Sequence, residues 1–137
     1  MNIKNNLSPL FWIGLASIIL IFPANADEFT KTDLKRWQGE FMKVVQDGEI
    51  LFHSGDLGKN GVSCDQCHPN AANTHPETYP KFQKQLGKVI PLFEMINWCI
   101  RNPLEGEPLE ADDPKMTAMQ AYILFERRGV PLEPGKH

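Results

Sequence analysis

Three stretches of the chain place apolar residues three and four positions apart, the spacing of an amphipathic helix. The first follows Thr30, which forms a capping-box pattern with Asp33, and it predicts a helix from about Lys31 to Asp47. Gly48 should interrupt this helix, with a further helical turn over 49–53. We expect its apolar positions to lie in the core; they are Leu34, Trp37, Phe41, Val44 and Val45.

The other two helices have clearer ends. One is predicted over Pro91–Arg101, where proline suits the first turn and Asn102-Pro103 ends the pattern. The last begins at Asp113-Pro114, a cap followed by proline at the first helical position, and ends with two arginines before Gly129. Their apolar faces are Leu92, Met95, Ile96 and Cys99 for the first, and Met116, Met119, Tyr122 and Ile123 for the second.

The segments between the helices are polar and rich in turn residues. Residues 54–63 form a glycine-rich loop, and residues 69–90 have no apolar period, so we expect them to be irregular. The second segment contains Lys81, Lys84 and Lys88, which form either a solvated basic face or a surface that steers an acidic partner. The pattern as a whole predicts a small all-α domain.

The first 26 residues have the pattern of a secretory signal peptide. A single charge at Lys4 precedes an apolar run from Leu10 to Phe22, and Ala24-Asn25-Ala26 forms a cleavage signature. We expect residues 1–26 to be removed and residues 27–137 to form one domain with no stable membrane span; an uncleaved N-terminal anchor is the alternative. Export places the mature chain in the periplasm.

The mature chain would be small and acidic. Loss of Lys4 leaves 13 of the 14 basic residues against 17 acidic ones, a net charge of −4. This balance excludes nucleic acid as an expected partner. A domain of 111 residues also has a thin core, so a large buried cofactor would stabilise it.

The motif Cys64-Asp65-Gln66-Cys67-His68 supplies that cofactor. Two cysteines three positions apart with a histidine directly after the second are typical of covalent haem c attachment. Cys64 and Cys67 would form thioethers with the porphyrin, and His68 would be the proximal ligand of the iron. A redox dithiol, half of a zinc site and a disulfide are the alternatives, but no second ligand pair and no thioredoxin-like context accompany the motif.

The second axial position of the iron has several candidates. Cys99 is the cysteine left over after haem attachment, and the thioethers of Met95, Met116 and Met119 compete with it, as does an open site. Each candidate can also be ordinary core packing. His75 is too close in sequence to His68 to reach the opposite face easily, so we expect it, like Tyr79, to contact a haem propionate or its own loop.

These motifs resemble a class I cytochrome c domain over most of residues 30–128. Segments such as Tyr79-Pro80-Lys81-Phe82, Met95-Ile96-Asn97-Trp98-Cys99 and the region from Met116 to Ile123 are similar to haem domains of Sox sulfur-oxidation cytochromes and thiosulfate dehydrogenases. The resemblance implies that Cys99 is the distal haem ligand and lies at the reacting centre. Two departures are a single haem motif and Trp98 at the place where the family often has arginine; the nearest arginine, Arg101, should face away.

The resulting hypothesis is a periplasmic monohaem c-type cytochrome that transfers single electrons to a redox partner protein, with Cys64, Cys67 and His68 holding haem c and its iron. Cys99 is the expected distal ligand and Met116 the alternative. One rival function is the haem subunit of a thiosulfate-oxidising or sulfur-conjugating enzyme, with a catalytic subunit as partner and Cys99 at the reacting centre. A haem-based gas-binding sensor with a labile sixth site is the other rival.

Overall fold

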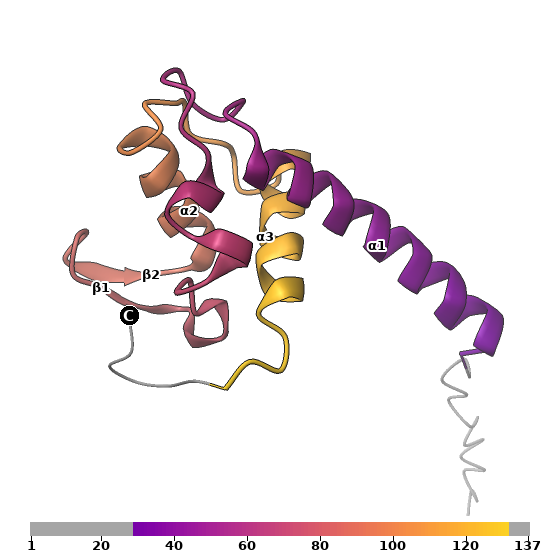
Figure 1. Cartoon of the computed structure of the whole chain (residues 1–137). Coiled ribbons are helices and arrows are strands. Elements are labelled where there is room, and N and C mark those ends of the chain that lie inside the picture. Colours follow the sequence, from indigo (N-terminus) through magenta and orange to yellow (C-terminus); the bar gives the residue numbers. More distant parts are fainter. Residues whose placement is uncertain (1–28, 132–137) are drawn as a thin grey trace, which may run out of the picture.

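The structure of the chain is a computed structural model that describes residues 29–131. Within this range the elements are α1 (Lys31–His53), β1 (Lys81–Gln83), β2 (Lys88–Ile90), α2 (Leu92–Arg101) and α3 (Pro114–Glu126), with three short 3-10 turns between α1 and β1 (Figure 1). The mostly helical architecture confirms the expected fold class. The signal peptide expected at 1–26 lies outside the described residues.

Helix α1 begins as predicted and ends later than predicted. The Thr30 hydroxyl accepts from the Asp33 backbone N–H at 3.1 Å, and the Asp33 carboxylate accepts from the Thr30 N–H at 3.2 Å. The expected interruption at Gly48 is wrong, because the helix continues without a break to His53. Gly48 instead faces α3, where a Cβ would overlap the carbonyl oxygen of Ala118 and lie 2.8 Å from Cβ of Tyr122.

Only the C-terminal half of α1 packs on the domain. Val45, Gly48 and Phe52 are buried, and this part of the helix lies against α3. The prediction that Leu34, Trp37 and Phe41 belong to the core is wrong, since their exposed fractions are 53%, 42% and 43%. Figure 1 shows why: the first turns of α1 project beyond the end of α3, where the rest of the domain cannot cover them.

Helix α3 passes through the centre of the domain. The Asp113 side chain accepts from the Lys115 backbone N–H at 2.7 Å, and Pro114 follows at the first helical position, so the predicted start is confirmed. Its predicted apolar face is buried and is joined by Ala118. The core around it contains Val45, Phe52, Leu57, Ala71, Ile96, Ile100, Leu104, Met116, Met119, Tyr122 and Ile123.

Helix α2 is fixed by one buried amide. The Asn97 side-chain N–H donates to the Leu109 carbonyl at 2.8 Å, and the Asn97 side-chain oxygen accepts from the Leu109 N–H at 2.8 Å. This pair of bonds replaces the backbone partners that Leu109 would find in a sheet. The loop 102–113 is thereby held against the helix, and α2 has a fixed orientation in the domain.

The β-hairpin is an element that the apolar pattern did not predict. Strands β1 and β2 are antiparallel, with Lys81 opposite Ile90 and Phe82 opposite Val89. In the turn, the Gly87 N–H donates to the Gln83 carbonyl at 2.8 Å, and Gly87 adopts a φ of +66° that favours glycine. Strands of three residues are too short to show the two-residue alternation on which a prediction from sequence depends.

Candidate haem site

A cavity of about 480 Å³ lies between the Cys-x-x-Cys-His segment, α2, α3 and the hairpin. Small-molecule and cofactor sites in proteins have volumes of about 300–1,000 Å³ and mostly apolar walls with a few polar groups. The walls here are of that kind. Apolar side chains that line the cavity include Phe52, Leu92, Met95, Ile96, Leu104, Met119 and Ile123.

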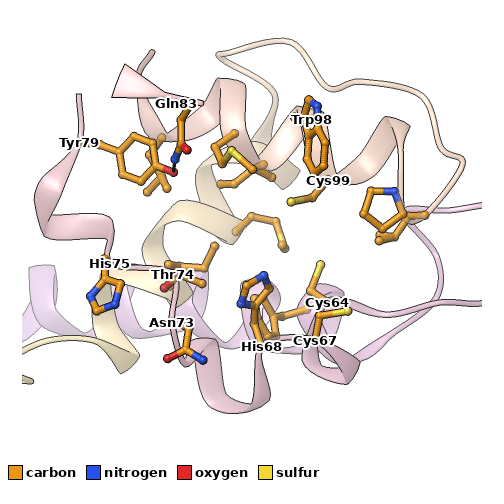
Figure 2. Close-up of a pocket in the computed structure, with 18 of the residues that line it drawn as sticks. Cys64, Cys67, His68, Asn73, Thr74, His75, Tyr79, Gln83, Trp98 and Cys99 are labelled. Atoms are coloured by element: carbon orange, nitrogen blue, oxygen red, sulfur yellow. Dashed lines mark hydrogen bonds between the residues drawn. The ribbon is translucent and has the colours of Figure 1, made fainter. Parts of the chain in front are cut away.

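One wall is formed by the Cys-x-x-Cys-His segment. Residues Cys64–Gln66 form a 3-10 turn, in which the N–H groups of Cys67 and His68 donate to the Cys64 carbonyl at 3.2 and 2.9 Å. The turn brings both thiols and the imidazole to one side of the cavity (Figure 2). The turn ends at Gln66, and Pro69 begins a second 3-10 turn, Pro69–Ala71.

The His68 ring is oriented by a backbone hydrogen bond. Its Nδ1 lies 2.9 Å from the carbonyl oxygen of Ala72, which can only accept, so Nδ1 carries the proton. The neutral ring then has its lone pair on Nε2. Metal-binding histidines are commonly held in this way, with the second nitrogen donating to a carbonyl or carboxylate. The ring therefore has the tautomer and the fixed orientation that an iron ligand needs.

Cys99 lies on α2, on the wall that faces this turn, and Figure 2 shows it across the cavity from His68 and Cys67. Burial, with a smaller contribution from the Cys67 thiol, raises the pKa of Cys99 to about 11. Burial also raises the pKa of Cys64 to about 12, with smaller contributions from Cys99, Asp65 and Cys67. As free thiols these groups are therefore protonated at neutral pH, and a metal would have to displace the proton to gain a thiolate ligand.

The other candidates for the distal position are distributed differently. Met116 is fully buried and is not among the residues that line the cavity, whereas Met95 and Met119 do line it. Trp98, which stands where the resembling family often has arginine, also lines the cavity. Arg101 is exposed and does not line it.

Polar side chains gather at one end of the cavity. Tyr79 accepts a hydrogen bond from the Gln83 side-chain amide, and the Lys81 ammonium lies 4.4 Å from the centre of the Tyr79 ring. His75 also lines the cavity, with its Nδ1 3.3 Å from a carboxylate oxygen of Glu77. An apolar chamber with hydroxyl, amide and ammonium groups at one end suits an amphipathic ring that carries carboxylates.

A second set of polar residues, behind the Cys-x-x-Cys-His turn, was not predicted. The ring of His53 lies 2.9 Å from a carboxylate oxygen of Asp65 and 3.2 Å from the Tyr122 hydroxyl. The Ser63 hydroxyl also donates to Asp65, and the two hydrogen bonds hold the pKa of that carboxyl below its usual range. Ser63 and Asp65 are near neighbours in sequence, but nothing in the sequence connects His53 with Tyr122, 69 positions later.

The other interpretations of the cysteines gain no support from the geometry. Cys64, Cys67 and Cys99 are all free, so the first two are not joined by a disulfide. Among residues 29–131, no three His, Cys, Asp or Glu side chains are grouped so as to hold a metal ion. A haem, whose porphyrin supplies four ligands to its iron, would require from the protein only axial ligands and attachment thiols, and imidazole and thiol groups line this cavity.

Within residues 29–131, no helix is long and apolar enough to cross a membrane.

Several known proteins are similar to part of this chain. A thiosulfate dehydrogenase of Allochromatium vinosum is 30% identical over 89 residues, which are 56% of this chain and 33% of that protein. The L-cysteine S-thiosulfotransferase subunit SoxA of Rhodovulum sulfidophilum is 26% identical over 109 residues, 77% of this chain and 38% of the relative. The crystal structure of SoxXA from P. pantotrophus has a similar fold, with a TM-score of 0.61 and 24% identity over 72% of this chain and 39% of that one.

The chain therefore spans about two fifths or less of the length of these relatives. The family model described as SoxA/TsdA, cytochrome c domain, matches residues 47–132. This match covers more than half of the chain and includes every residue that forms the two facing walls of the cavity. The chain thus belongs to the SoxA/TsdA cytochrome c domain family, and the cofactor that such a domain implies is haem c with its iron.

Proposed function

We propose that this chain is an exported, monohaem c-type cytochrome that transfers single electrons in sulfur-compound oxidation. Residues 1–26 are removed as a signal peptide, and residues 27–137 act as one haem domain in the periplasm. Cys64 and Cys67 hold haem c covalently, and His68 and Cys99 ligate its iron from opposite faces. The observation that carries the proposal is the arrangement of these four residues on two facing walls of one apolar cavity.

The chemistry follows from what such walls do to an iron centre. Apolar lining lowers the local dielectric, and two fixed axial ligands keep the coordination unchanged between ferric and ferrous iron. A thiolate at Cys99 is an anionic donor and favours ferric iron, so the centre should have a low reduction potential. The transferred species is one electron, which an external carrier supplies or accepts.

The test uses protein produced with a c-type haem maturation system. We expect a mass equal to residues 27–137 plus one haem, resistance of that haem to acid–acetone extraction, and a reversible one-electron titration at low potential. Replacement of both motif cysteines, Cys64→Ser with Cys67→Ser, should give protein without covalent haem. Wild-type protein that is exported without haem, or that titrates at the high potential of a His/Met centre, would contradict the proposal.

A second function is favoured by the position of Cys99 in an open cavity and by the relatives. Cys99 is partly exposed, and two relatives are a thiosulfate dehydrogenase and a subunit of an L-cysteine S-thiosulfotransferase. In this alternative the domain is a haem subunit, works with a catalytic subunit, and has Cys99 at the reacting centre. Anaerobic addition of thiosulfate to ferric protein tests it: reduction of the haem supports chemistry at this domain, and an unchanged ferric spectrum leaves electron transfer as the function.

A further inference from the structure

The hairpin presents an apolar pair to solvent. Phe82 and Val89 are directly opposite each other in the register, and they are 63% and 64% exposed. Because successive residues of a strand point to opposite faces, both lie on the outer face of the hairpin, while Ile90 on the inner face is fully buried. The two side chains form a small exposed apolar patch on the hairpin.

The hairpin that carries this pair is positively charged. Lys81, Lys84 and Lys88 lie in the ten residues from Lys81 to Ile90, which contain no acidic residue, although the chain as a whole has a net charge of −3. The Lys88 ammonium is 2.8 Å from a Glu94 carboxylate oxygen. Among residues 29–131, no carboxylate lies within ion-pair distance of Lys84. The hairpin is therefore a local positive region on an acidic protein.

The hairpin also borders the cavity. Lys81 and Gln83 of β1, and Gln85 of the turn, line the cavity that contains Cys99 and His68. The ion pair between Lys88 and Glu94 connects β2 to the first turn of α2, the helix that carries Cys99. A protein that lies on the outer face of the hairpin is consequently separated from the cavity by the two strands β1 and β2.

We propose that this surface, the hairpin patch of Phe82, Val89 and Lys84, is the docking site for an acidic electron-carrier protein. The carrier has an apolar centre ringed by carboxylates. Its apolar centre complements Phe82 and Val89, and its carboxylates complement the positive charge of the hairpin. The proposal rests on the electron-transfer function proposed above: ferrous haem gives one electron to the oxidised carrier and becomes ferric. The contact area of the patch is small, as in other transient redox complexes. Because opposite charges attract across this contact and salt screens them, association should weaken as ionic strength rises.

The experiment follows electron transfer from ferrous holoprotein to an oxidised, acidic blue-copper protein by stopped flow. At low ionic strength Lys84→Glu should slow the second-order rate roughly five- to tenfold, and the difference should vanish in high salt. The double variant Phe82→Ser/Val89→Ser should raise the dissociation constant by about tenfold at every salt concentration, because it removes the apolar centre.

Matched control variants lie on α1, which projects away from the hairpin (Figure 1). Lys35→Glu makes the same change of charge, and Leu34→Ser/Ile50→Ser replaces two exposed apolar residues, 53% and 66% exposed in the native chain. We expect both control variants to react like the wild type. Equal slowing by Lys35→Glu and Lys84→Glu would reduce the effect to net charge and overturn the docking site.

The two proposals fail in different ways. Binding is also measured by calorimetry with both proteins oxidised, where no electron moves, and hexacyanoferrate(III) tests separately whether the haem can be reoxidised. If the haem reacts with hexacyanoferrate(III) while the hairpin variants bind and react like wild type, the docking site is wrong and electron transfer stands. If no reoxidation occurs but the hairpin variants lose binding, the docking surface stands and the electron-transfer function is wrong.

Discussion

Cys99 and His68 are held by different means. His68 is oriented by a hydrogen bond to the Ala72 carbonyl within its own turn, whereas Cys99 depends on the placement of α2, which Asn97 fixes through Leu109. The position of His68, the proposed proximal ligand, thus depends on a short stretch of sequence, whereas that of Cys99, the proposed distal ligand, depends on the packing of α2. Chemical changes at Cys99 should therefore alter the iron centre without loss of haem attachment.

Replacement of Cys99 by methionine tests this role. Cys99→Met exchanges an anionic thiolate for a neutral thioether, which stabilises ferric iron less, so the reduction potential should rise by about 0.1–0.3 V within the range of about 0.8 V that axial ligands control. The measurement is an optical redox titration with ferric EPR. Met116→Leu is the matched control, since Met116 is buried away from the cavity and its replacement should leave both spectrum and potential unchanged. An unaltered potential in Cys99→Met would show that Cys99 does not ligate the iron.

Asp65 should make the stability of the holoprotein depend on pH. Hydrogen bonds from Ser63 and His53 lower its pKa in the folded state, while in the unfolded chain the carboxyl keeps its ordinary pKa of about 4. The unfolded state therefore binds the proton first as pH falls. The stabilisation is complete above about pH 5 and is lost as pH falls through the lowered folded pKa.

We expect Asp65→Asn to lower the midpoint of denaturant unfolding at neutral pH and to make that midpoint less dependent on pH below about pH 5. Unfolding curves at a series of pH values measure both effects. Asp56→Asn, which removes a loop carboxylate outside this network, serves as the control. Identical acid profiles for Asp65→Asn and wild type would mean that the network with His53 and Ser63 does not stabilise the fold.

At the scale of elements, the contact between α1 and α3 depends on one missing side chain. Gly48 lies in the middle of α1, where glycine is unfavourable, and its place is explained by the backbone of Ala118, which no Cβ could approach. The close approach brings His53 within reach of Tyr122 and sets the end of α1 behind the haem-attachment turn. Helix propensity alone would favour alanine over glycine at position 48, whereas packing against α3 requires glycine.

Two glycine substitutions in the same helix should consequently have opposite effects. Gly48→Ala introduces a clash with backbone and should destabilise the holoprotein by about 1–3 kcal/mol. Gly39→Ala, at a position with nothing within 4 Å of the added Cβ, should stabilise it by about 0.5–1 kcal/mol through helix propensity. Guanidinium unfolding measures both; stabilisation by Gly48→Ala would contradict the close packing of α1 on α3.

At the scale of the whole molecule, the structure consists of a compact haem domain and a projecting helix end. The family match begins at residue 47, close to where α1 meets α3, and the exposed apolar residues Leu34, Trp37 and Phe41 of α1 precede that point, whereas Ile50 follows it. The cavity, the hairpin patch and the contact of α1 with α3 all belong to the matched region. The first turns of α1, up to residue 40, contribute little to the burial that stabilises the domain.

Hydrogen exchange should show this division. Amides in residues 35–40 should open with a free energy close to zero, because the side chains of that part of the helix are exposed, whereas those in residues 45–52 should open with a free energy near that of global unfolding. Hydrogen exchange of the holoprotein at several protein concentrations, followed by mass spectrometry or NMR, measures the difference in opening free energy. Equal protection along α1 would mean that another surface covers Leu34, Trp37 and Phe41.

Much of the local structure could be predicted from sequence. Capping residues and prolines located the starts of α1 and α3, and the three-to-four-residue spacing located the buried face of α3, because these signals lie within a few residues of what they determine. The Cys-x-x-Cys-His segment likewise specifies its own turn and, with the family match, the cofactor. Prediction failed at Gly48 and along the first half of α1, where the outcome depends on which segment lies opposite.

The sequence by itself determined the helical class, the Cys-x-x-Cys-His motif and the basic character of residues 81–88. Only the tertiary structure decided that Cys99 faces His68, that Met116 lies away from the cavity and that Phe82 and Val89 form one exposed pair. The physical reason is that spacing along a chain records contacts within one or two turns. Positions that meet across a cavity or a strand pair are set by the packing of whole elements, which no single segment encodes.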